Sequence, residues 1–327
     1  MNSSTFVKAA FLFALILQLT ACERGAEAPQ PVSETPLPSE VTPVTPTMNM
    51  EQHDQRLLAF FDETFERNVS QSPEFQAQLG RKTEDYGRWD DHSDAWAVTR
   101  REQAEADLAR LRAEFDYDAL SPSAQLSYRI FEYDQQQALR NFPWRHHDYA
   151  VTQMNNIASD IPTFLQNLHK VETRADAEAY IARLAGVETV MAQYIELLRL
   201  GESQGVIPPM LVYPRVLPAA GNMLQGAPFE EAAEDGVLLA DFRGKLAALE
   251  LDNAERDILL NDAANALSGP FRTGYAALIA ELTRLQGLAD DNNGIWDLPE
   301  GADFYANRIQ NWTTIARPAE EIHERGR

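Results

Sequence analysis

The sequence is poor in cysteine and in basic residues. Its 327 residues contain a single cysteine, Cys22, so no intrachain disulfide can form. Lysine and arginine together number 28, against 50 aspartates and glutamates, and the formal net charge is -22. A charge of this sign repels a phosphate backbone, so we expect no nucleic-acid partner. The hydrophobic content of 44% is enough for a core in one large domain or two small ones.

Motifs that carry known chemistry are also missing. The sequence has no G-x-S-x-G nucleophile motif, no Walker A loop and no dinucleotide-binding fingerprint. No two of its six histidines are four residues apart, the spacing that turns two imidazoles toward one zinc ion. His323 and Glu324 begin a stretch like H-E-x-x-H, but Arg327 stands where the second histidine would be. From motifs alone we expect no catalytic residue, no metal ligand and no cofactor in this chain.

No hydrophobic run is long enough to cross a bilayer of about 30 Å. The apolar run of residues 9–19 follows Lys8 and has the length of a signal-peptide core. The four residues Leu-Thr-Ala-Cys that end at Cys22 resemble the lipobox of bacterial lipoproteins. We therefore predict a lipoprotein signal peptide over residues 1–22 and a membrane anchor on a lipidated Cys22. The alternative is a buried helix start that happens to hold a cysteine.

This anchor predicts a location in the cell envelope. The protein would face the periplasm from the outer membrane, or lie on the cell surface. Residues 23–48 are rich in proline, threonine, serine and glutamate, and they contain six prolines. Such a segment cannot bury enough apolar surface to fold, so we predict a disordered tether.

Residues 49–327 show helical periodicity, and we predict an all-α fold, an irregular array of several helices. Leu57, Phe61 and Phe65 define one apolar face with Leu58 beside them, and Leu126, Ile130 and Tyr133 define another. Thr173 and Asp176 form a capping box. The one strand candidate is 210–216, which Pro214 demotes to an edge strand or an extended loop. The expected helices span residues 51–69, 99–116, 122–139, 173–201, 228–249 and 253–288.

Two kinds of polar segment are candidate sites. Asp90, Asp91, His92 and Asp94 lie within nine residues and form either a loop for a hard cation or, as we expect, a solvated acidic turn. Segments 148–156 and 208–216 carry polar residues beside Pro-rich turns, as a cleft wall would, although interhelical capping explains them equally well. The candidate cleft-lining residues are His147, Gln153, Asn155, Tyr213 and Arg215.

Several stretches together resemble one bacterial family. They are "SPSAQLSYRIFEYDQQQAL", "YAVTQMNNIASDIPTFLQNLHKVETRADAEAYIARL", "GVIPPMLVYPRV" and "GIWDLPEGADFYANRIQNWTT" followed by "EEIH". Their order and spacing, over residues 50–323, resemble the domain of unknown function 885 family. Members of that family are often lipoproteins and are related to zinc metallopeptidases of mostly helical fold. The resemblance implies that this chain forms half of a larger gluzincin-like helical fold.

The resemblance also implies where the chemistry lies. In the family the zinc-binding H-E-x-x-P-G-H-type motif comes far downstream of the stretch that contains His323. The chain therefore resembles the N-terminal half of a peptidase, with zinc expected only in a C-terminal half. We expect no peptidase activity from this half alone, whereas the complete protein would act on a peptide. The final residues "ERGR" depart from the family pattern, as a frameshift or a sequence edge would produce.

Two further expectations follow. A final helix that starts near residue 318 is short, so the 327-residue product should be poorly stable unless that helix is packed. The competing hypothesis for function is a non-enzymatic lipoprotein that binds an envelope partner through a helical surface.

Overall fold

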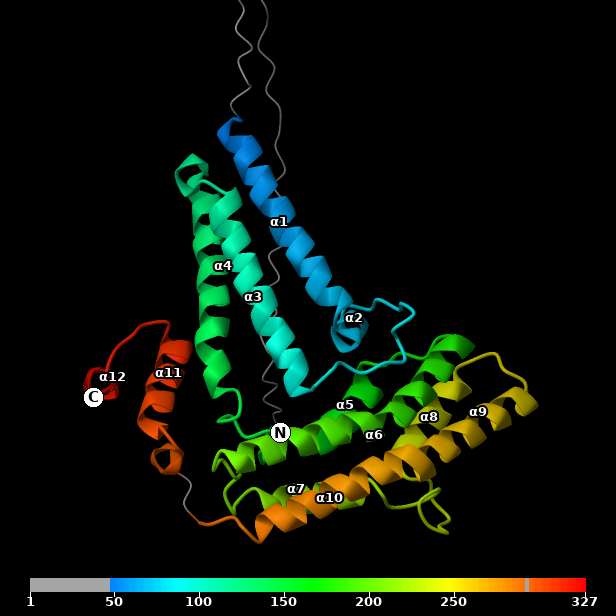
Figure 1. Ribbon diagram of the computed structural model, residues 1–327. Coiled ribbons are helices and arrows are strands. Elements are labelled where there is room, and N and C mark those ends of the chain that lie inside the picture. The colour runs from blue at the N-terminus through cyan, green and yellow to red at the C-terminus, as the bar shows by residue number, and fades with distance from the viewer. Residues whose placement is uncertain (1–47, 292–293) are drawn as a thin grey trace, which may run out of the picture. The chain divides into compact units, whose positions relative to one another are not determined.

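The computed structural model describes residues 48–291 and 294–327, and helices make up nearly all of its regular structure (Figure 1). The described part contains no strand, only an isolated β-bridge between Ala227 and Asp235. The all-α prediction is therefore confirmed. The predicted signal peptide, the tether up to residue 47 and the lipidation site Cys22 lie outside the described residues. No helix within them is both long and apolar enough to span a membrane.

Three long helices, α1, α3 and α4, share one apolar cluster (Figure 1). Each begins at a polar cap: the side chains of Asn49, Ser93 and Ser121 accept hydrogen bonds from backbone N–H groups of the first turn. These caps explain why the helices start where they do. The helices span Met50–Ser70 (α1), Asp94–Glu114 (α3) and Pro122–Asn141 (α4). The buried cluster consists of Leu57, Phe60, Leu111, Phe115, Leu120, Ala124 and Tyr128.

The predicted faces of α1 and α4 are partly wrong. Leu58 and Phe65 are 56% and 43% exposed, because Phe60 and Thr64 share the buried face of α1 with Leu57. On α4 the predicted Leu126 and Ile130 are exposed, and the smaller Ala124 is buried together with Tyr128. Each of these two helices has more apolar residues than its core contact buries, so periodicity alone could not select the packed side. The helix predicted from residue 99 begins at Asp94, one residue after the cap Ser93.

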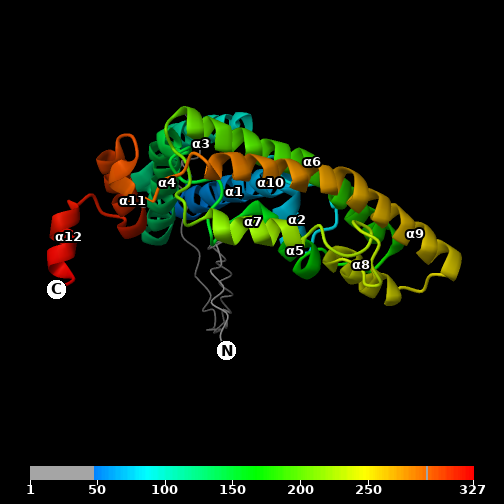
Figure 2. The same ribbon diagram turned by 90° about the horizontal axis from the view of Figure 1, so that it is seen from below.

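The second group of helices surrounds α6, the longest helix, which packs along α10 (Figure 2). The capping box of Thr173 and Asp176 is confirmed. Gly186 of α6 is closely packed, because a Cβ there would lie 3.0 Å from the Trp89 ring. The bounds are Ile157–Asn167 (α5), Arg174–Ser203 (α6), Tyr213–Asn222 (α7), Val237–Ala247 (α8), Asn253–Ala266 (α9) and Arg272–Gln286 (α10).

Three predicted elements in this group are wrong. Segment 210–216 enters α7 rather than a strand, and Pro214 occupies the first turn, where its missing N–H is not needed. The helix predicted over 228–249 begins only at Val237. The helix predicted over 253–288 is broken into α9 and α10 by η3 (Leu267–Phe271), where Gly269 and Pro270 interrupt the helical backbone.

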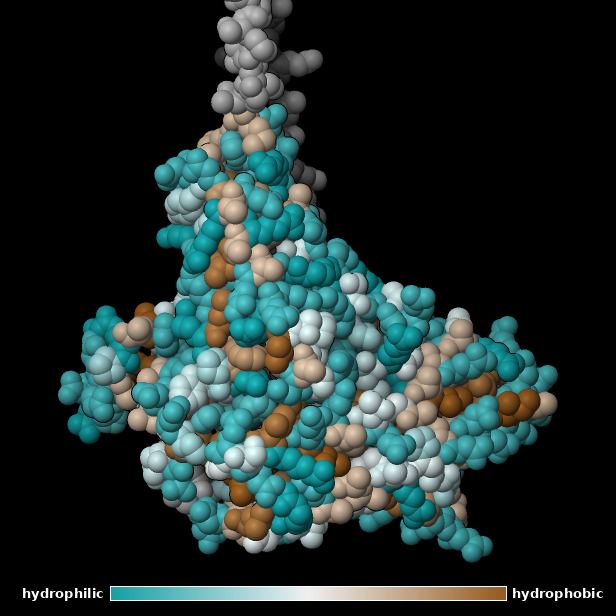
Figure 3. All heavy atoms as spheres, viewed as in Figure 1, coloured by the Kyte–Doolittle hydropathy of each residue, from teal (hydrophilic) through white to brown (hydrophobic). Residues whose placement is uncertain are grey.

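Shorter helices complete the described part. Helix α11 contacts the end of α4, and α12 carries His323 on an exposed surface. On the face shown in Figure 3, hydrophilic residues cover most of the surface and apolar residues form small groups. The remaining bounds are Pro73–Gln78 (α2), Tyr117–Ala119 (η1), Phe142–Trp144 (η2), Ile295–Asp297 (η4), Gly301–Thr313 (α11) and Ala319–Arg325 (α12).

Candidate functional site

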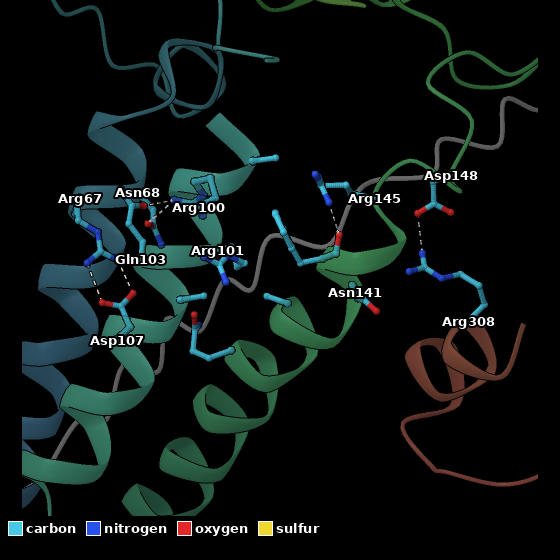
Figure 4. Close-up of a pocket in the computed structure, with 15 residues that line it drawn as sticks. Arg67, Asn68, Arg100, Arg101, Gln103, Asp107, Asn141, Arg145, Asp148 and Arg308 are labelled. Atoms are coloured by element: carbon cyan, nitrogen blue, oxygen red, sulfur yellow. Dashed lines mark hydrogen bonds and ion pairs between the residues drawn. The ribbon is translucent and has the colours of Figure 1, made fainter. Parts of the chain in front are cut away.

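A cavity of about 600 Å³ opens among α1, α3 and α4 (Figure 4). The loop after α4 and helix α11 complete one end of it, through Arg145, Asp148 and Arg308. Five arginines but only two aspartates line this cavity, in a chain whose net charge is -22. The charged residues of the lining are Arg67, Arg100, Arg101, Arg145, Arg308, Asp107 and Asp148.

Arg67 of α1 and Asp107 of α3 form a two-pronged ion pair at the cavity wall. Arg67 Nη1 lies 2.8 Å from Asp107 Oδ1, and Nη2 lies 2.5 Å from Oδ2. Asp107 is only 5% exposed, so its carboxylate is largely withdrawn from water. Both of its oxygens are occupied by Arg67, and this geometry fixes α1 against α3.

A second set of ion pairs lies at the other end of the cavity. Arg145 Nε donates to Asp94 Oδ1 at 2.7 Å, and Arg308 Nη1 donates to Asp148 Oδ2 at 2.8 Å. Arg145 lowers the pKa of Asp94. Burial, with Arg145 next to it, lowers the pKa of His146, so that this ring is neutral at pH 7.

Arg100 differs from these arginines, because neutral amides hold it. Its Nη1 donates to the side-chain oxygens of Asn68, Gln71 and Gln103, at 2.8, 3.4 and 3.3 Å. Within the described residues no carboxylate lies within 4.0 Å of its guanidinium. Desolvation and the charge of Arg67 lower the pKa of Arg100, although the residue is exposed to solvent.

A smaller cavity of about 370 Å³ is also lined by Arg100. Asn68 and Arg100 line both cavities, and Phe75, Asp90 and Trp96 belong to the smaller one. Burial and the neighbouring Glu74 raise the pKa of Asp90. Arg100 therefore stands at the junction of two hollows, between α1 and α3.

The five predicted cleft-lining residues do not line the larger cavity. His147 follows the loop residue Arg145 but is buried, and its Nε2 donates to the Pro299 carbonyl at 3.0 Å. Tyr213 is fully buried at the start of α7, and burial raises the pKa of its hydroxyl to about 12.

Gln153, Asn155 and Arg215 have exposed side chains. Asn155 closes a turn in which its backbone carbonyl accepts hydrogen bonds from Thr152. The structure therefore does not gather these residues and His147 into one site. Their role as a cleft wall stays a prediction.

The acidic segment before α3 is tied to neighbouring helices. Asp90 accepts hydrogen bonds from Ser72 Oγ at 2.6 Å and from the Glu74 backbone at 2.9 Å, and Asp94 pairs with Arg145. Asp91 accepts from the Ser93 backbone and from Gln193. The segment thus connects α2 to α3 and α6.

The described residues do not fit a zinc site. Among residues 48–291 and 294–327, no three His, Cys, Asp or Glu side chains are grouped so that they could hold a metal ion. No step of a zinc-dependent reaction is therefore assigned to them.

Sequence reasoning missed the arginine-lined cavity except for Asp148, the first residue of the segment 148–156 predicted as a cleft wall. Its residues come from α1, α3, the loop after α4 and α11, and the paired Asp148 and Arg308 are 160 positions apart. The adjacent Arg100 and Arg101 in an acidic chain were the one available signal, and surface ion pairs on a helix give the same pattern.

Comparisons with known proteins identify relatives of the chain. The family described as "Bacterial protein of unknown function (DUF885)" matches residues 73–327. No curated protein matches the sequence.

One solved structure has a similar fold and a second is a weaker match, and both are described as a "putative lipoprotein". The protein from Colwellia psychrerythraea is 17% identical with a TM-score of 0.68, and the match covers 83% of this chain and 48% of that one. The protein from Shewanella oneidensis, of unknown function, is 16% identical with a TM-score of 0.47, over 74% of this chain and 39% of that one. The chain thus spans about half the length of the Colwellia protein.

Proposed function

Because the chain belongs to the DUF885 family of bacterial proteins of unknown function, we propose that it is the helical part of an envelope lipoprotein. Lipidated Cys22 would hold it at the membrane, and residues 23–47 would separate the helices from the lipid. The apolar run of residues 9–19 after Lys8 and the small residues before Cys22 support this anchor. The fold shared with the Colwellia protein, itself described as a lipoprotein, agrees with it.

The anchor is tested on Cys22→Ser in a bacterial host that processes lipoproteins. We expect the wild-type chain to incorporate labelled fatty acid and to sediment with membranes. Cys22→Ser should do neither, and Ser33→Ala in the proline-rich segment serves as the matched control. An unlabelled wild-type chain in the soluble fraction would contradict the proposal.

We propose further that these helices belong to a zinc-dependent peptidase whose metal ligands lie in other residues. The observation that carries this proposal is the coverage of the Colwellia protein: most of this chain matches less than half of that one. The resemblance of the matched stretches to peptidase relatives supplies the reaction class, hydrolysis by a metal-activated water. In this proposal the described helices shape the substrate cleft and contribute no ligand.

The test begins with the gene. Sequencing past the codon for Arg327 is expected to find a reading frame that continues, directly or after a one-base shift, into an H-E-x-x-H-type motif. The protein encoded by that frame should bind one zinc ion and cleave peptides, with loss of both after chelation. A clean stop codon in good-quality sequence would refute the peptidase proposal.

A non-enzymatic binding lipoprotein is the second candidate, and the cavity between α1, α3 and α4 favours it. A cavity of about 600 Å³ falls in the range of ligand-binding pockets, and polar side chains converge on it. Binding without turnover by the longest encoded protein would distinguish this candidate from the first.

A further inference from the structure

We propose that the cavity between α1, α3 and α4 binds an anionic ligand, whose carboxylate or phosphate group pairs with Arg100. This inference does not depend on the peptidase proposal, because it concerns binding by described residues alone.

The first argument is the balance of charge. Acids outnumber bases across the whole chain, yet arginines outnumber aspartates around this cavity. Four of the five arginines have a carboxylate partner: Arg67 pairs with Asp107, Arg101 with Glu105, Arg145 with Asp94 and Arg308 with Asp148. Arg100 is the fifth, and its only described partners are amides.

The second argument is the geometry of the guanidinium. Its three hydrogen bonds all leave from Nη1, so Nε and Nη2 make none to the described residues. Arg100 is an exposed residue, so solutes can reach its side chain. Nε and Nη2 form the edge of an arginine that binds a carboxylate or phosphate through two parallel hydrogen bonds. The amides therefore orient Arg100 and leave that edge open.

The third argument is that Asp107, the acid whose charge acts on Arg100, cannot neutralise it. Asp107 is held through both oxygens by Arg67, and its weak electrostatic effect on Arg100 is smaller than the opposing effect of Arg67. A bound anion would supply the missing negative charge. Arg100 lines cavities of about 600 and 370 Å³, and these have room for a small molecule or the end of a short peptide.

The experiment titrates the full 327-residue chain with two probes in low-salt buffer, followed by calorimetry and by NMR of arginine side chains. The probes are inorganic phosphate and acetyl-trialanine with a free carboxylate, and the carboxamide form of the same peptide is the uncharged comparison. The variants are Arg100→Gln and Arg100→Lys. The matched control is Arg112→Gln, because Arg112 pairs with Glu132 and does not line the cavity.

We expect at least one anionic probe to bind saturably and the carboxamide not to bind. Arg100→Gln should weaken binding about tenfold or more, as expected for loss of charge-assisted hydrogen bonds. Arg100→Lys should fall between it and the wild type, because lysine keeps the charge but not the two-pronged edge. Arg112→Gln should bind like the wild type.

Preference for phosphate would identify a phosphorylated ligand, and preference for the peptide would identify a carboxylate ligand; both support the proposal. Absence of saturable binding of either probe would overturn it. So would equal weakening by Arg112→Gln, since that result would show a general effect of net charge. Circular dichroism checks that Arg100→Gln is folded. If it is not folded, binding by Arg100→Lys is compared with binding by Arg112→Gln, and weaker binding by Arg100→Lys alone supports the proposal.

Discussion

His169 provides a pH-dependent test of the packing between α5 and α6. Its ring is fully buried, stacks on Tyr86 at 4.4 Å and meets the edge of Tyr180. Nε2 donates to the Asp176 carbonyl at 3.0 Å, and Nδ1 has no hydrogen-bond partner among the described residues. Burial lowers the pKa of His169 to about 4 from its ordinary 6.5, with a smaller contribution from the nearby positive charges.

The direction of the effect follows from proton binding. Between pH 6.5 and about 4 the unfolded chain binds a proton at His169 that the folded chain excludes, so the free energy of unfolding falls as the pH falls. From these two pKa values, His169 should remove about 1.3 kcal/mol of stability between pH 7.5 and 5.5. The lower pH stays above the isoelectric point of about 4.6, where the chain would precipitate.

The assay compares the wild type with His169→Phe by urea denaturation at both pH values. Phenylalanine keeps the aromatic stack but cannot titrate, and it costs about 1 kcal/mol at pH 7.5 through the lost hydrogen bond. The variant should lose about 1.3 kcal/mol less than the wild type on going to pH 5.5. His323→Gln, at an exposed position, should follow the wild type. Parallel pH dependence of the wild type and His169→Phe would refute the reasoning.

Two further predictions concern packing in the second group of helices. Glu281 is 5% exposed, and hydrogen bonds from Arg284 and Arg199 lower its pKa to about 2. Glu281→Gln should therefore lower the free energy of unfolding by about 2 kcal/mol at pH 7, measured by urea denaturation. This loss should become smaller as the pH falls from about 4.5 toward 2. Gly274→Ala should cost about 1–3 kcal/mol, because its Cβ would lie 2.9 Å from the Glu188 backbone. Gly244 lies inside α8, and a Cβ there would meet no atom within 4 Å, so Gly244→Ala should raise the free energy of unfolding by about 0.5–1 kcal/mol. A gain in stability from Gly274→Ala would contradict the packing described.

Features of the fold that depend on neighbouring residues were predictable. The capping box of Thr173 and Asp176 and the start of α4 after Ser121 are decided within one helical turn, so the sequence alone locates them. The break between α9 and α10 was missed although Gly269 and Pro270 mark it, because an unbroken apolar period on both sides favoured one long helix.

The candidate site could not be predicted, since it is built from long-range contacts. Arg67 and Asp107 are 40 positions apart, and nothing in either local sequence indicates the other. The polar residues chosen from the sequence, such as Gln153 and Asn155, instead belong to a local turn, where polar side chains satisfy their own backbone. Composition indicated an acidic surface, but it could not show that the arginines gather on one cavity.

One end of that cavity depends on α11, which is attached to α4 mainly through amides. Asn311 Oδ1 accepts hydrogen bonds from Gln137 and, at 2.9 Å, from Asn141. The apolar side chain that α11 buries is Phe304, whose ring lies against Trp144 and His147. Such an attachment is expected to open locally before the rest of the chain unfolds.

Asn311→Ala should therefore release α11 without changing global stability. Loss of these hydrogen bonds costs roughly 2 kcal/mol, which corresponds to about 30-fold faster amide exchange in α11. Trp312→Ala removes a larger but 79% exposed side chain and should leave exchange unchanged. Equal exchange in the two variants would show that the amides do not hold the helix. If the prediction is correct, Arg308 leaves Asp148 whenever α11 opens, so a ligand that also contacts Arg308 would favour the docked helix.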